Sequence, residues 1–283
     1  NILVQSILTI LVLSTSVLAE INHPHRVTDL PGAPAVPQIP LYAGYIDVKI
    51  NATVHSVFYV LCESIRSNPL DSPLVVWLNG GPGASSLLGL FLEHGPYLVD
   101  PATGKLGYSD FSWNQYSNVL YIESPSNVGF SHANKRIDNY SDGKVADLNM
   151  KTLHQFMTRV HPRYATRDFF ITGASFAGNY VPFFAQAILL GLKTGQFTND
   201  NFKGIAIGNA GMDLLTRKLD SSMQSFAMGM IPQKFSHALF EYWELWQKEW
   251  TDVFNSFSDL DRVMLFNFNL KGPDIDFIYE HIS

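Results

Sequence analysis

Ser175 lies in a stretch whose residue types suit nucleophilic catalysis. An apolar run over residues 169–172 precedes it, an apolar helical pattern follows it, and small residues surround it: Gly173, Ala177 and Gly178. A strand, a tight turn and a helix in this order lift a serine hydroxyl above the sheet edge. The first N–H groups of the helix then point at the charge that forms during acyl transfer. A serine that begins a helix is often only an N-cap, so this segment alone also allows a structural role.

A second stretch supplies the backbone donors that such a nucleophile needs. Residues 79–83 (NGGPG) follow the continuous apolar run of residues 74–78, which predicts a buried strand. Open α/β sheets bind ligands at the carboxyl ends of their strands, and glycine lets backbone N–H groups approach a substrate oxygen. A structural turn is the alternative for this loop alone. Together, the loop and the serine turn provide the nucleophile and the oxyanion hole of an acyl-transfer site.

The composition limits the classes of protein to consider. The 283 residues are 46% hydrophobic, which is enough for one large α/β domain or two small ones. The chain has 19 basic and 25 acidic residues, a formal net charge of −6, and no run of Lys or Arg. No nucleic acid partner is expected.

The first residues predict a secretory route. Residues 1–19 are mostly apolar and end in small residues that suit a signal peptidase, although the chain has neither an initiator Met nor a basic segment at its start. A membrane anchor is the rival interpretation, but the run is short and interrupted by polar residues. Two glycosylation sequons begin at Asn51 and Asn139, and Cys62 is the only cysteine, a low count for a secreted domain of this size.

Periodicity predicts a mainly parallel α/β core over residues 41–212, preceded by a proline-rich arm over residues 20–40. Residues 42–50 and 54–62 predict an antiparallel hairpin at one edge of the sheet. Buried strands are expected at residues 74–78, 119–122, 169–172 and 204–208, with helices at 85–93, 141–160 and 180–190.

Residues 213–283 show no further strand pattern and predict a helical cap over the site. Aromatic residues recur at helical spacing after Pro232. A packed helix face explains them better than a ligand-stacking surface does.

Several blocks of the sequence, in order, resemble the signature motifs of the serine carboxypeptidases. They are residues 78–87 (LNGGPGASSL), 92–96 (LEHGP), 112–114 (SWN), 122–125 (IESP) with 128–131 (VGFS), 169–178 (FFITGASFAG) with 180–182 (YVP), and 203–209 (KGIAIGN). The resemblance covers roughly residues 30–232. It implies an α/β-hydrolase fold with an N-terminal antiparallel hairpin and a helical cap insertion, in which the last strands of the sheet are missing from this chain.

The resemblance also assigns roles. Ser175 matches the nucleophile, and the amides of Gly81 and Phe176 match the oxyanion hole. Asn79, Gly80 and Glu93 match positions that bind the free α-carboxylate of the substrate. An amide and a protonated glutamic acid can both donate hydrogen bonds to that carboxylate, which would favour acidic working conditions. No metal or cofactor is implied.

The sequence departs from the family pattern in several places. Ala174 stands where the family carries a second carboxylate-reading Glu, Ala84 replaces a family cysteine, and Phe176 replaces a tyrosine. No segment matches the late blocks that carry the triad Asp and His, and neither His237 nor His281 suits the role of base. Without a base a serine is a poor nucleophile, so the chain as given is expected to be nearly inert.

The sequence therefore predicts a secreted or lysosomal serine carboxypeptidase, truncated before its triad Asp and His. Its partners would be peptides or proteins with a free C-terminus, with no stable membrane anchor after signal removal, and a homodimer is left open. A catalytically inactive binding or protective relative and an acyltransferase of the same fold are the alternatives.

Overall fold

The computed structural model describes residues 23–34, 39–66, 68–137, 139–212, 223–232 and 234. The chain divides into two units, residues 1–210 and 211–283. The predicted leader over residues 1–19 and the aromatic positions predicted after Pro232 lie outside the described residues, as do His237 and His281.

The fold begins with the predicted antiparallel hairpin. Strand β1 (Leu41–Ile50) pairs with β2 (Thr53–Cys62) along its whole length, from Leu41 opposite Cys62 to Ile50 opposite Thr53. The turn between them places Asn51 at φ 54°, a left-handed conformation that Asn tolerates better than most residues. The hairpin prediction is confirmed.

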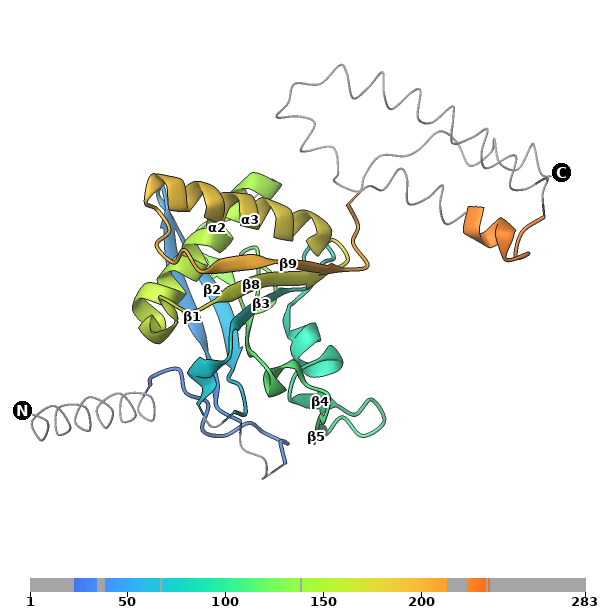
Figure 1. Cartoon of the computed structure of the whole chain (residues 1–283), viewed down its shortest axis with the longest axis horizontal. Coiled ribbons are helices and arrows are strands. Elements are labelled where there is room, and N and C mark those ends of the chain that lie inside the picture. The colour runs from blue at the N-terminus through green and yellow to red at the C-terminus, as the bar shows by residue number, and fades with distance from the viewer. Residues whose placement is uncertain are drawn as a thin grey trace, which may run out of the picture. The chain divides into compact units, whose positions relative to one another are not determined.

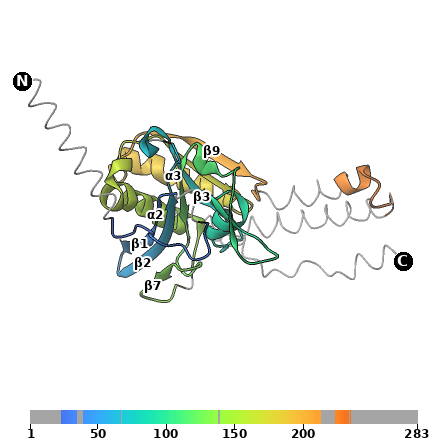
Figure 2. The same cartoon turned by 90° about the horizontal axis from the view of Figure 1, so that it is seen from below.

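The hairpin continues into a mainly parallel sheet with the strand order β1-β2-β6-β3-β8-β9. Strands β3 (Leu74–Leu78), β6 (Asn118–Ile122), β8 (Phe169–Ala174) and β9 (Phe202–Gly208) run parallel to one another, and β6 meets β2 antiparallel. All five residues of β6 are buried, as the apolar run predicted. A short strand, β7 (His132–Ala133), pairs with β2 off this path (Figure 2).

Two helices cover one face of this sheet (Figure 1). Helix α2 (Asp142–Gln155) is capped by Ser141, whose side chain accepts a hydrogen bond from the Lys144 amide, and continues into the π-turn η4 (Phe156–Val160). Helix α3 (Ala177–Thr194) ends at Gly195, which has a left-handed φ of 75°. Both predicted helices are confirmed, although α3 starts three residues earlier than its periodicity indicates.

The other face carries shorter elements. They are the π-turn η2 (Gly89–Glu93), the hairpin β4 (Tyr97–Val99) and β5 (Leu106–Tyr108), and the 3₁₀ turn η3 (Trp113–Gln115). The 3₁₀ turn η1 (Pro69–Asp71) precedes β3, and its Leu70 packs against the same apolar cluster as α2 and α3. The 3₁₀ turn η5 (Pro162–Tyr164) follows η4. Two clusters of buried apolar side chains result, one containing α2 and α3 residues and one built around Trp77, Leu90 and Tyr121. The short helix predicted over residues 85–93 is confirmed for residues 87–93, of which 89–93 form the π-helical turn η2.

In the second unit the described residues contain a helical segment at 223–227. No helix within the described ranges is long and apolar enough to cross a membrane.

Candidate active site

Ser175 sits at the apex of a strand–turn–helix. Strand β8 ends at Ala174, α3 begins at Ala177, and Ser175 adopts φ 61° between them. A non-glycine residue in this left-handed region costs on the order of 1–3 kcal/mol and persists only where its surroundings enforce it. Here the Ser175 amide donates to the Gly208 carbonyl at 3.0 Å, and the Ser175 carbonyl accepts from the Gly178 amide at 2.9 Å.

The Ser175 side chain is not a helix cap. The N-cap position of α3 is Phe176, and no side chain caps this helix. Ser175 is exposed, and its hydroxyl makes no hydrogen bond within the described part of the chain. The structural alternative raised by the sequence, a serine that serves as an N-cap, is therefore wrong for this residue.

The glycine loop packs directly against this turn. A Cβ atom placed on Gly80 would lie 2.4 Å from the Phe176 nitrogen and 2.7 Å from the Ala174 carbonyl oxygen, so only glycine fits. Gly81 follows with φ 110°, a conformation that L side chains rarely adopt. The structure thus brings Gly80 against Ser175 and Phe176, three of the residues that the sequence predicted to share one site, and Gly81 is the next residue of the loop.

The Asn79 side chain is oriented by its surroundings. Its Oδ1 accepts hydrogen bonds from the Trp77 indole nitrogen at 2.7 Å and from the Gly89 amide at 3.0 Å. This leaves the amide nitrogen to donate, and it donates to Oε1 of Glu93 at 3.1 Å. Asn79 is 8% exposed, whereas Glu93 is exposed. Two of the predicted carboxylate-binding side chains therefore lie in direct contact.

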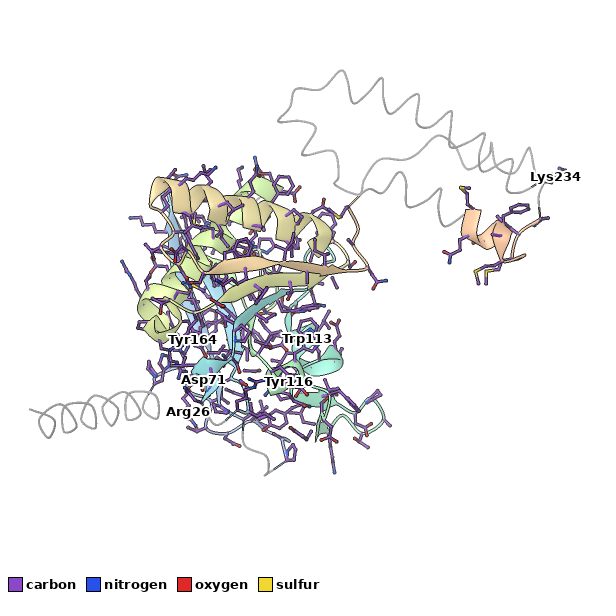
Figure 3. The ribbon with its side chains drawn as sticks, in the orientation of Figure 1. Arg26, Asp71, Trp113, Tyr116, Tyr164 and Lys234 are labelled. Carbon is purple, nitrogen blue, oxygen red and sulfur yellow. The ribbon has the colours of Figure 1, made fainter. Side chains whose placement is uncertain are left out.

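A group of aromatic rings includes Trp77, whose indole nitrogen donates to Asn79. His94 stacks on Trp113 with 4.2 Å between ring centroids, meets Trp77 edge-on at 4.3 Å, and shares a 3.1 Å hydrogen bond between its Nδ1 and the Tyr121 hydroxyl. Burial lowers the pKa of His94 to about 4, which keeps the ring neutral at neutral pH. Trp113 lies on the sheet face opposite α2 and α3 (Figure 3).

Sequence reasoning missed two residues that hold the loop. The Tyr180 hydroxyl accepts a hydrogen bond from the Gly83 amide at 3.2 Å, and burial raises the pKa of Tyr180 to about 12. Glu123 is fully buried and accepts a hydrogen bond from the Ser85 hydroxyl. Both residues belong to motif blocks of the sequence, and a charged residue at the end of a buried strand was the available signal for Glu123.

The other positions singled out from the sequence, Ala174, Asn51 and Asn139, are at least partly exposed. Ala174 is partly exposed beside Ser175, which leaves the neighbouring position without an acid. Asn51 and Asn139, the two sequon asparagines, are exposed. In the described ranges no His or Asp side chain contacts the Ser175 hydroxyl.

Comparison with known proteins agrees with this geometry. The sequence model of the family described as serine carboxypeptidase matches residues 31–275. The chain is 41% identical over 208 residues to the serine carboxypeptidase ctsa-4.1 of Caenorhabditis elegans, with 74% of this chain and 42% of that protein covered. It is 41% identical over 180 residues to the lysosomal protective protein of Mus musculus, with 64% of this chain and 36% of that protein covered. The chain thus spans about two fifths of the length of these relatives.

The fold is also similar to a solved structure. The prohormone-processing carboxypeptidase Kex1Δp of Saccharomyces cerevisiae superposes with a TM-score of 0.72 at 25% sequence identity, covering 92% of this chain and 64% of that one. This similarity and the mainly parallel sheet with its serine turn confirm the α/β-hydrolase fold. With most of its length matched by the family model, this chain belongs to the serine carboxypeptidase family.

Proposed function

We propose that this chain carries the nucleophile and the substrate-binding residues of a carboxypeptidase active site. Such an enzyme removes single residues from the C-termini of peptides or proteins. Ser175 attacks the last peptide carbonyl, and the amides of Gly81 and Phe176 stabilise the oxyanion. The observation that supports this most is the contact of Gly80 with the Phe176 nitrogen, which sets the loop against the strained serine.

The substrate's free carboxylate is bound by Asn79, Gly80 and Glu93 in this proposal. A carboxypeptidase must read a carboxylate one residue beyond the scissile carbonyl. The Asn79 amide nitrogen is already fixed as a donor, because two other groups occupy its oxygen. A protonated Glu93 carboxyl could donate a second hydrogen bond, whereas an ionised one would repel the ligand.

The reaction proceeds through an acyl-enzyme. The Ser175 oxygen bonds to the carbonyl carbon, the C–N bond breaks, the terminal amino acid leaves with a proton on its nitrogen, and water then hydrolyses the ester. Both steps need a general base, which takes the proton of the Ser175 hydroxyl in the first and the proton of the attacking water in the second. The resemblance to the family implies that this base is a histidine oriented by an aspartate. No histidine or aspartate lies next to Ser175 in the part of the chain that the structure describes.

A catalytically inactive protective or binding relative is the second candidate. Ala174 favours it, because the position next to the nucleophile lacks the second acid that the resemblance implies. This candidate retains the carboxylate site and predicts binding of peptides without their hydrolysis.

A fluorophosphonate probe distinguishes the two candidates, because it phosphonylates only an activated serine. The proposal predicts an adduct on Ser175 in a protein that also includes the triad Asp and His, and none in Ser175→Ala. Peptide binding without any adduct would favour the inactive relative.

We also propose the secretory pathway or the lysosome as the location. One relative's name places it in the lysosome, and the two sequon asparagines, Asn51 and Asn139, are exposed and could carry glycans. Treatment of protein expressed in a secretory host with an N-glycosidase should lower its apparent mass, and an unchanged mass would argue against glycosylation.

A further inference from the structure

The carboxylate of Glu123 is buried at the carboxyl end of β6, next to the strand that leads into the glycine loop. The residue has 0% exposure. Its Oε2 accepts a hydrogen bond from the Phe130 amide at 2.6 Å, and its Oε1 accepts one from the Ser85 hydroxyl. Within the described ranges no Lys, Arg or His pairs with it. A buried carboxylate is costly unless fixed donors satisfy it, so these two hydrogen bonds are what keep it in place.

The two donors come from different loops. Phe130 belongs to the loop that follows β6, whereas Ser85 follows the glycine loop. The Ser85 oxygen also accepts from the Leu87 amide at 3.1 Å, which leaves its proton directed at Glu123. The hydroxyl of the next residue, Ser86, accepts a hydrogen bond from the backbone amide of Asn79 at 3.2 Å. Ser86 thus binds the first residue of the glycine loop, and Ser85 binds Glu123.

The loop after β6 is shaped around this carboxylate. Gly129 has φ 52°, and a Cβ atom placed on it would lie 1.9 Å from Oε1 of Glu123. The Ser131 hydroxyl donates to the Glu123 backbone carbonyl at 2.6 Å and accepts from the Phe58 amide at 2.7 Å. A side chain at position 129 and the Glu123 carboxylate therefore cannot occupy the site together.

We propose that Glu123 is a positioning residue for the acyl-transfer site. Acting through Ser85, it fixes the glycine loop so that the Gly81 amide faces the Ser175 turn. This inference rests on the proposed function of Gly81 and Ser175. A carboxylate suits the role because it only accepts hydrogen bonds and can receive both donors at once. Glutamine at this position keeps the hydrogen bond from the Phe130 amide only if its NH₂ group faces Ser85, whose hydroxyl then has to accept instead of donate.

Hydrogen exchange of the loop amides tests the positioning step without requiring activity. The reporters are the amides of Gly83 and Ala84, which donate to the Tyr180 hydroxyl and to the Gly80 carbonyl. Glu123→Gln should speed their exchange about tenfold, while the amides of β8 keep their protection. Ser85→Ala should have the same effect, Ser85→Thr should restore slow exchange, and the double variant Glu123→Gln with Ser85→Ala should add little to either change.

Two glycine variants provide a steric test of the same contact. Gly129→Ala pushes the carboxylate aside and should also loosen Gly83 and Ala84. Gly143→Ala lies in the first turn of α2, where nothing stands within 4 Å of the added methyl group, and should leave the loop unchanged. Wild-type exchange at Gly83 and Ala84 in Glu123→Gln would overturn the proposal. So would equal acceleration in β8, which would indicate general destabilisation.

The rate of Ser175 phosphonylation gives the functional readout. In a protein that labels, Glu123→Gln should lower the maximal rate of labelling about tenfold and leave the half-saturating probe concentration unchanged, because a displaced oxyanion donor acts in the transition state. If the wild-type protein does not label at Ser175, the proposed function fails, and the exchange data still decide the role of Glu123. A normal maximal rate in Glu123→Gln would overturn that role.

Discussion

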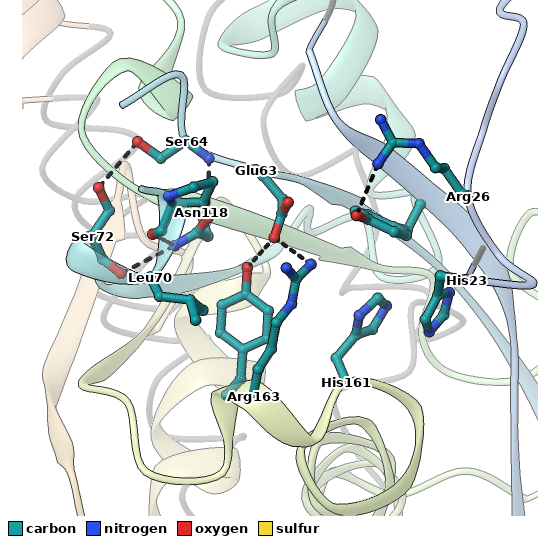
Figure 4. A network of polar contacts seen from close by, with 12 residues as sticks. His23, Arg26, Glu63, Ser64, Leu70, Ser72, Asn118, His161 and Arg163 are labelled. Atoms are coloured by element: carbon teal, nitrogen blue, oxygen red, sulfur yellow. Dashed lines mark hydrogen bonds and ion pairs between the residues drawn. The ribbon is translucent and has the colours of Figure 1, made fainter. Parts of the chain in front are cut away.

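Lowering the pH should destabilise the folded core through His161, the residue that joins η4 to η5. His161 is 1% exposed. Its Nε2 lies 2.9 Å from the Tyr59 hydroxyl. Its ring stacks on His23 with 4.3 Å between centroids, and the two rings lie side by side in Figure 4. Its Nδ1 is buried and has no hydrogen-bond partner within the described residues. A proton added to this ring would bring an unpaired charge into the core.

Burial, together with the nearby His23, Arg163 and His25, lowers the pKa of His161 from 6.5 to about 2. The unfolded chain therefore binds a proton at a pH where the folded protein does not. Stability from this group is complete above about pH 6.5 and is lost as the pH falls toward 2. Each unit of pH in this window costs about 1.4 kcal/mol, so the free energy of unfolding should drop by about 2–3 kcal/mol between pH 7 and pH 4.5. Burial also lowers the pKa of His25, which acts in the same direction.

Urea unfolding at a series of pH values measures this term. His161→Gln cannot take up the proton, so its free energy of unfolding should fall less steeply with pH than that of the wild type. The difference in slope between pH 6 and pH 4 should be about 1.4 kcal/mol per pH unit, which corresponds to the uptake of one proton on unfolding. The matched control is His132→Gln, because His132 is exposed on β7 and should leave the slope unchanged. Equal slopes for wild type and His161→Gln would refute the reasoning.

Three further substitutions test the site. Gly80→Ala places a methyl group 2.4 Å from the Phe176 nitrogen and should destabilise the protein by about 1–3 kcal/mol in urea unfolding. Gly204→Ala is the control, because no atom lies within 4 Å of the added methyl group, and should not destabilise the protein. Equal effects of the two variants would contradict the close approach of Gly80 to Phe176. Tyr180→Phe removes the acceptor of the Gly83 amide and should cost about 1 kcal/mol, seen as faster exchange of that amide; unchanged exchange would argue against the contact. Ala174→Glu should increase the preference for a peptide with a free C-terminal carboxylate over its C-terminal amide by about 1–3 kcal/mol in calorimetry. The preference should also depend more strongly on acid pH. An unchanged preference would show that an acid at position 174 does not bind the substrate carboxylate.

The sheet could be predicted closely because its strands are continuous apolar runs. Residues 74–78 and 119–122 are buried on both faces, so their pattern leaves few alternatives, and the hairpin alternates in the usual way. The start of α3 was harder to predict. Small residues after Ser175 carry little periodicity, and the helix already begins at Ala177.

The sequence predicted the residues of the candidate site but not the hydrogen bonds that hold them in place. Gly80, Gly81, Ser175 and Phe176 stand in recognisable motifs, and the structure places Gly80 against Ser175 and Phe176. The hydrogen bonds from the Gly83 amide to Tyr180 and from Ser85 to Glu123 join residues far apart in the chain, so no local pattern could indicate them. The neutral state of His94 likewise depends on three aromatic neighbours that only the fold assembles.

The most direct test of the central claim is phosphonylation of Ser175 in competition with peptides. A protein that comprises this chain together with the triad Asp and His is treated with a fluorophosphonate and mapped by mass spectrometry. The account predicts one adduct, on Ser175, whose formation is slowed by a peptide with a free C-terminus and not by the same peptide as a C-terminal amide. An adduct elsewhere, no adduct, or equal protection by both peptides would contradict a serine nucleophile paired with a carboxylate-reading site.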